Sequence, residues 1–72
     1  MKSIEVKFGI VLKELRNKKG LTQEDLAIQS DLDRTYISLL ERGLRQPTIS
    51  TLFKIAEVLE VTPSSIIKKL EE

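Results

Sequence analysis

Cysteine and histidine, two residues on which much protein chemistry depends, are absent from this chain. Without cysteine there is neither a disulfide framework nor a thiolate metal site, and nothing argues for an oxidising compartment. Without histidine the most common general base and the most common zinc ligand are missing. The carboxylates and arginines are also not accompanied by a Gly-rich phosphate loop or a metal-spaced cluster. We therefore expect no catalytic residue, no metal and no cofactor, and the protein is not expected to be an enzyme.

Long apolar runs are lacking as well. No stretch of the sequence approaches the roughly 18 consecutive apolar residues that a membrane span requires, and the N-terminal segment is charged. We expect no membrane partner, and the cytoplasm is the default location.

The composition is that of a folded protein, with 40% hydrophobic and 32% charged residues. A chain of 72 residues is expected to form a single domain over residues 1–72, with a small core and no deep substrate cavity. The net charge is only +1, so a case for a nucleic-acid partner must rest on where the charges lie.

Apolar residues recur at spacings of three and four in every segment, which predicts an all-α fold with a compact arrangement of five helices. The first helix is expected over about 4–18, the second from a cap at 22 to about 30, and the third over about 34–42. Thr48 or Ser50 caps the fourth helix, and the fifth begins at Pro63. The other end signals are two glycine stops and three polar caps: Gly20, Gly43, Thr22, Asp33 and Thr62.

The second and third helices are separated by a short turn around Asp31, a residue that tolerates a left-handed backbone. Two helices joined in this way have the spacing of a helix-turn-helix, here over about 22–42. In that motif the second helix lies in the major groove of DNA.

Four features carry a resemblance to a known family: "LTQEDLA" at 21–27, "YISLLERG" at 36–43, Pro47, and "TLFKIAEVLEV" at 51–61. In this order and spacing they resemble the lambda-repressor-like, five-helix domain of the phage repressor and Cro type of helix-turn-helix protein. Within that family, "LDRTYIS" and "ERGLRQPT" are most similar to the controller proteins of restriction-modification systems. Asp31 departs from the motif, which usually has glycine at this position. The departure affects only the expected geometry of the turn between the two helices.

The resemblance implies a sequence-specific transcription regulator that binds double-stranded DNA. It would bind a pseudo-palindromic operator as a homodimer and control its own gene and the endonuclease gene, as activator or repressor. RNA polymerase is a further candidate partner, with Glu24 and Asp25 as candidate contacts. The alternative is a protein-interaction module, such as an antitoxin, that binds DNA to regulate its own expression.

The start of the third helix supplies the candidates for reading bases: Arg34, Thr35, Tyr36 and Ser38. Arg34 suits bidentate contact with guanine, the most common specific contact in DNA recognition. The candidates for contact with the DNA backbone are Gln23, Arg42 and Arg45. Gln23 would direct its amide and its backbone N–H at a phosphate, at the start of the second helix.

Each of these candidates also has a structural interpretation. Arg34 can form a surface pair with Asp33, and Tyr36 can pack on the edge of the core. Arg45 can satisfy carbonyls after a helix end, and Gln23 can be an ordinary helix-start residue.

The C-terminal half is expected to form the dimer, over about 49–70. The predicted interface residues are Phe53, Ile66, Ile67 and Leu70. The argument is that one short helix exposes more apolar surface than a core filled by the first four helices can cover, and the alternative is that these residues only complete the monomer core. By the resemblance, Arg16 and Glu41 form an internal, structural ion pair between the first and third helices.

Overall fold

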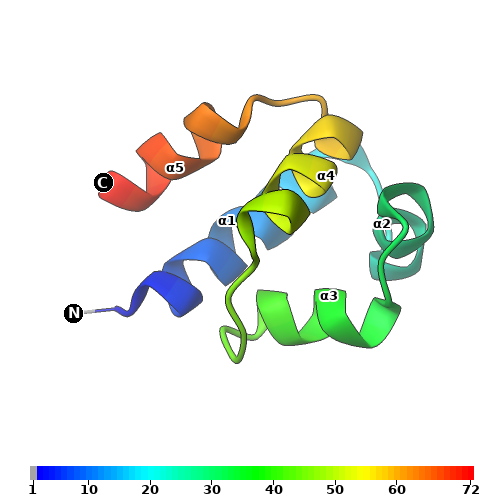
Figure 1. Ribbon diagram of the computed structural model, residues 1–72, viewed down its shortest axis with the longest axis horizontal. Coiled ribbons are helices and arrows are strands. Elements are labelled where there is room, and N and C mark those ends of the chain that lie inside the picture. Colours follow the sequence, from blue (N-terminus) through cyan, green and yellow to red (C-terminus); the bar gives the residue numbers. More distant parts are fainter. Residues whose placement is uncertain (1) are drawn as a thin grey trace.

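A computed structural model describes residues 2–72 of the chain. The described part consists of helices and short connections, with no strand (Figure 1). The five helices are α1 (Ile4–Lys19), α2 (Gln23–Ser30), α3 (Arg34–Glu41), α4 (Ile49–Leu59) and α5 (Pro63–Glu71). The all-α, five-helix prediction is confirmed, and the helix boundaries agree with the expected ones to within a residue or two.

Local capping explains where α2 begins. The hydroxyl of Thr22 accepts a hydrogen bond from the backbone N–H of Asp25, and the carboxylate of Asp25 accepts one from the backbone N–H of Thr22. This reciprocal pair satisfies two backbone donors that the helix leaves unpaired. The hydrogen bonds from Thr22 also hold the pKa of Asp25 below its ordinary value.

The other ends follow similar rules. Asp33, Thr48 and Thr62 cap α3, α4 and α5, so Thr48 rather than Ser50 begins the fourth helix. At the helix C-termini, Asp31 and Glu60 adopt left-handed backbone conformations, each with φ of 58°. Asp31 therefore supplies the turn geometry that glycine usually provides in the motif.

All five helices contribute to one apolar core. Its members come from facing stripes at helical spacing: Phe8, Leu12, Leu26, Ala27, Ile37, Leu40, Leu52, Ile55, Ala56, Leu59 and Ile66. Figure 1 shows α1 and α4 in the middle of the molecule, with α2 on the right, α3 along the lower edge and α5 at the upper left.

The prediction that Ile66 contributes to a dimer surface is wrong. Its side chain is 1% exposed and lies in the core, because α5 packs against both α1 and α4. Leu70 is half-buried against the same core. The apolar surface that the first four helices leave open is therefore covered by α5 of the same chain. Of the three α5 residues predicted for the dimer interface, only Ile67 is exposed.

The third helix, α3, lies along the lower edge of Figure 1, with one long side uncovered by other elements. Its inward side chains, Ile37 and Leu40, are fully buried. Its end meets α1 at Gly9, where a Cβ atom would lie 2.6 Å from the carbonyl oxygens of Leu40 and Glu41. Only glycine permits this approach of backbone to backbone.

Residues 2–72 contain neither a membrane-spanning helix nor a cluster of metal ligands. No helix there combines the length and apolar character needed to cross a membrane. That part of the chain also has no group of acidic, cysteine or histidine residues that would hold a metal ion.

Candidate nucleic-acid interface

The uncovered side of α3 carries the predicted base-reading residues. Arg34 and Thr35 are exposed, and Ser38 is half-buried one turn further along. The carboxylate of Asp33 accepts a hydrogen bond from the backbone N–H of Thr35 at 2.8 Å. Asp33 thus serves as the helix cap, and the described part of the chain has no ion pair between it and Arg34. The Arg34 side chain is left available to a ligand.

Tyr36 connects α3 to the loop that follows it. Its ring packs against the core, and its hydroxyl donates a hydrogen bond of 3.5 Å to the carbonyl oxygen of Gln46. The pKa of Glu5 lies below its ordinary value, because the Glu5 backbone N–H and, to a smaller extent, the Gln46 side chain stabilise the Glu5 carboxylate. The loop that presents exposed Arg45 is therefore tied to α3 by the Tyr36 hydroxyl.

Charge is distributed unevenly on this side of the molecule. Between residues 34 and 47 the charged residues are Arg34, Glu41, Arg42 and Arg45. The three arginines are exposed, whereas the Glu41 side chain is only 3% exposed and is paired with Arg16. The exposed charges of residues 34–47 are therefore all positive, although the net charge of the whole chain is only +1. Two exposed acidic residues lie beside Arg34: Asp33 precedes it in the chain, and Glu24 lines the same cleft.

The Arg16–Glu41 pair is bidentate and connects α1 to the end of α3. Nε and Nη2 of Arg16 donate to the two carboxylate oxygens of Glu41 at 2.5 and 2.9 Å. Nη1 of Arg16 donates to the carbonyl oxygen of Leu21 at 2.8 Å. The hydrogen bonds that Arg16 donates to the Glu41 carboxylate raise the pKa of Arg16. A paired and hydrogen-bonded charge of this kind is the form in which ions are tolerated inside proteins.

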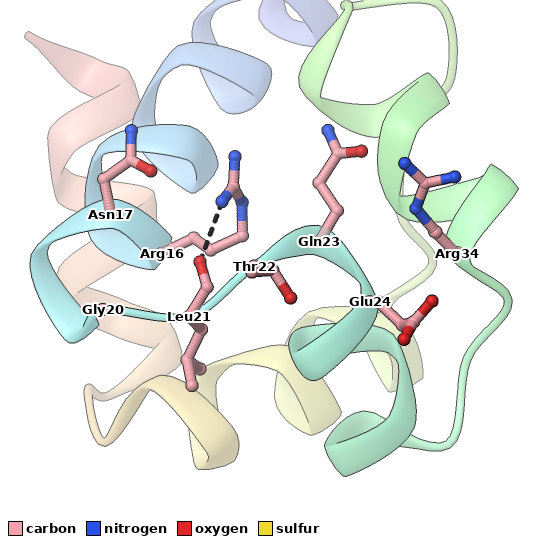
Figure 2. Close-up of a pocket in the computed structure, with 8 residues that line it drawn as sticks. All are labelled: Arg16, Asn17, Gly20, Leu21, Thr22, Gln23, Glu24 and Arg34. Carbon is pink, nitrogen blue, oxygen red and sulfur yellow. Dashed lines mark hydrogen bonds between the residues drawn. The ribbon is translucent and has the colours of Figure 1, made fainter.

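An open cleft of about 580 Å³ lies between the end of α1, the start of α2 and the start of α3. Gln23 and Arg34 both line it, as Figure 2 shows. The first backbone N–H groups of α2 lie at the same place, where a helix N-terminus favours an anion.

The Gln23 side chain makes a contact within the protein instead of the expected contact with a phosphate. Its amide nitrogen donates a hydrogen bond of 3.0 Å to Glu41, so this N–H is not free to meet a phosphate. Residues separated by 18 positions make this contact, and no local pattern in the sequence could reveal it. Sequence reasoning also missed Gln46 and Gly9, which act through contacts between distant segments.

The predicted dimer residues lie on α4 and α5, away from the uncovered side of α3. Phe53 and Ile67 are 58% and 42% exposed. Ile49, one turn before Phe53 on α4, is 71% exposed. We call these three residues the apolar face.

A capped helix pair with a short turn, and a second helix that exposes polar and cationic side chains, define a helix-turn-helix protein. Residues 12–66 match the helix-turn-helix family, and the chain belongs to it.

Among known proteins, the chain is similar to control proteins of restriction-modification systems. It is 42% identical to the control protein C.MunI of Mycoplasma sp., over 100% of this chain and 99% of that one. It is 38% identical to the control protein C.BamHI of Bacillus amyloliquefaciens, over 90% of this chain and 82% of that one. The crystal structure of the restriction-modification controller protein C.AhdI from Aeromonas hydrophila superimposes with a TM-score of 0.83 and 45% identity, covering 86% of this chain and 94% of that one. These relatives are regulators rather than enzymes.

Proposed function

We propose that this protein is a sequence-specific, DNA-binding transcription regulator of the restriction-modification controller type. The observation that carries the proposal is the exposed surface of α3 and its loop, where arginines are the only exposed charges. Such a surface attracts the phosphate backbone, and a recognition helix with a free first turn reaches base edges. The similarity to control proteins over nearly the whole chain supports the controller role.

The binding mode follows from the positions of the side chains. Arg34 lies at the tip of α3 and contacts guanine O6 and N7 in the major groove. Thr35 and Ser38 contact bases or phosphates beside it, and the rim of the Tyr36 ring lies against the DNA backbone.

Arg42 and Arg45 neutralise phosphates beside the groove, since both are exposed at the far end of α3 and in the following loop. The backbone N–H of Gln23, at the N-terminus of α2, supplies a further phosphate contact.

A homodimer is the expected functional form. The apolar face of Ile49, Phe53 and Ile67 provides the surface that a second copy covers, and α3 remains free. Two-fold dimers set their recognition helices about 34 to 36 Å apart, which matches one turn of DNA and a pseudo-palindromic operator.

Activation of the endonuclease gene requires contact with RNA polymerase. Glu24 is the exposed acidic residue of α2 available for it, since the Asp25 carboxylate is engaged in the helix cap. A regulator of this kind works in the cytoplasm, beside the DNA.

The proposal is tested by selecting bound sequences from a random DNA pool and then titrating the enriched sequence at several salt concentrations. We expect a two-fold symmetric site bound by two chains, with an affinity that falls steeply as salt rises because counterions are released from phosphates. A salt-independent affinity, or a pool without enrichment, would contradict the proposal. The second result would redirect attention to the protein-interaction alternative.

A further inference from the structure

Several polar side chains of the cleft at the start of α2 are already engaged within the protein. Arg16 donates hydrogen bonds to the Glu41 carboxylate and to the carbonyl oxygen of Leu21. The amide nitrogen of Gln23 also donates to Glu41. The hydroxyl of Thr22 accepts the hydrogen bond that caps α2. These side chains shape the cleft, but their main hydrogen-bonding groups are not available to a ligand.

The other polar side chains that line the cleft are Asn17, Glu24 and Arg34. Within residues 2–72 these three side chains form no hydrogen bond or ion pair with the rest of the protein. Glu24 carries a negative charge and only acceptors, so it repels a phosphate. Arg34 is the proposed base reader. Asn17 is therefore the one uncharged side chain of the cleft with an N–H donor that no protein group uses.

The turn after α1 brings Asn17 beside the start of α2. Gly20 ends α1 in a left-handed conformation with φ of 77°, and the chain then turns directly into α2. Asn17 lies in the last turn of α1 and is exposed. Figure 2 shows Asn17 and Arg34 at opposite ends of the cleft, with Gln23 between them and Glu24 on the side of Arg34. The acidic residue of the cleft is therefore the more distant one from Asn17.

We propose that Asn17 is a further DNA contact, which donates an N–H of its side-chain amide to a phosphate oxygen. In a helix-turn-helix complex the second helix enters the groove while the first helix crosses the DNA backbone. A strand that crosses the start of α2 passes the end of the cleft where Asn17 lies. Asparagine side chains are among those that contact phosphates in this way. The inference rests on the proposed function, because it needs α2 and α3 to dock on DNA.

The first test is Asn17→Ala, which removes the amide from an exposed position without breaking a contact inside the protein. We expect affinity to fall by about 2- to 12-fold on every sequence, the range of one hydrogen bond. The slope of the salt dependence should not change, because an uncharged donor releases no counterion. Gln29→Ala, at an exposed position of α2 outside the cleft, is the control and should bind like the unaltered chain. Unchanged affinity in Asn17→Ala would overturn the inference.

A charge placed at the same position tests whether a phosphate lies there. Asn17→Lys should increase the slope of the salt dependence by about 1, because the added cation neutralises one more phosphate. Gln29→Lys adds the same charge beside α4, in a depression that Lys54 and Glu57 also line, and should leave the slope unchanged. Equal slopes in the two lysine variants would mean that no phosphate lies at Asn17, and the inference would be overturned.

Operators in which one phosphate at a time is replaced by an uncharged methylphosphonate identify the contact. The unaltered chain should lose affinity when the phosphate bound by Asn17 is replaced, and Asn17→Ala should lose less at that position and the same amount at all others. Identical profiles for the two chains would overturn the inference. An unaltered chain that shows no salt-dependent DNA binding contradicts the proposed function instead, so the two failures are distinguishable.

Discussion

The recognition helix α3 and the C-terminal pair of α4 and α5 share one core, but they differ in what holds them and in what they expose. The end of α3 is fixed by the Arg16–Glu41 pair, by the hydrogen bond from Gln23 and by the backbone approach at Gly9. The helices α4 and α5 meet the rest of the molecule mainly through buried apolar side chains such as Ile66. Two polar contacts add to these, the hydrogen bond from Lys7 to the carbonyl oxygen of Leu70 and the ion pair of Lys19 with Glu60.

This difference corresponds to two kinds of binding. Apolar contact has little directional preference, whereas hydrogen bonds and charged pairs hold groups at defined angles. A helix that reads base edges, as we propose for α3, needs a defined orientation, and the end of α3 is held by a buried, bidentate ion pair. The proposed dimer face needs apolar area, and exposed apolar side chains are found on α4 and α5.

The largest expected effect concerns the polar anchor of α3. Arg16→Met should lower the free energy of unfolding by about 3 to 5 kcal/mol, because the buried Glu41 carboxylate loses its charge partner. Denaturant unfolding measures the loss. Lys18→Met is the control, at an exposed position of the same helix, and should have little effect. Equal losses in the two variants would mean that the buried pair contributes no more than a surface charge.

Substitutions in the apolar face should weaken the dimer without lowering the stability of the monomer fold. Phe53→Ser should raise the dissociation constant of the dimer by at least about tenfold, because each buried phenylalanine contributes about 1.5 to 3 kcal/mol. Sedimentation over a range of concentrations measures this change. Ile28→Ser, at a position that is 71% exposed on α2, is the control. If the dimer forms with Phe53→Ser but dissociates with Ile28→Ser, the interface lies on α2 and not on α4 and α5.

Two arginines of the α3 surface should behave differently on DNA. Arg34→Ala should reduce discrimination at one base pair by about 5- to 150-fold, the range of one bidentate base contact. Arg42→Ala should weaken binding to all sequences alike and reduce the slope of the salt dependence by about 1. Titrations of several operators at two salt concentrations separate the effects. A uniform loss after Arg34→Ala would end its assignment as a base reader.

The smallest effect concerns the turn between α2 and α3. Asp31→Gly should raise the free energy of unfolding by about 0.5 to 1 kcal/mol, because glycine adopts the left-handed conformation without steric cost. Asp33 has a φ of −80°, so Asp33→Gly gains nothing there and loses a helix cap, at a cost of a few tenths of a kcal/mol. Thermal unfolding of both variants should show shifts of opposite sign.

The helix ends were predictable because their signals are local. Thr22 and Asp25 are separated by three residues, and their reciprocal bonds form within one turn. Gly20 and Asp31 stop their helices through their own backbone conformations. The left-handed end at Glu60 has no such signal, since glutamate is an ordinary residue for a helix interior.

The site was predictable only in part. Exposure of Arg34, Thr35 and Arg42 agrees with the surface positions that DNA contact requires, and their contact with DNA remains a prediction. The orientation of the Gln23 amide depends on Glu41, and the burial of Ile66 depends on how α5 sits against α1 and α4. Such facts belong to the tertiary structure and not to any short segment.

The uncovered side of α3 has a consequence for how such proteins diversify. Within residues 2–72, the side chains of Arg34, Thr35 and Ser38 form no hydrogen bond with the rest of the protein, and the helix is held from its opposite side by Ile37 and Leu40. Mutations at these three positions therefore carry little penalty for folding. On the proposed base contacts, a lineage can change its operator by mutation at a few surface positions while the scaffold stays constant, and the same positions are the ones to randomise when a new DNA target is wanted.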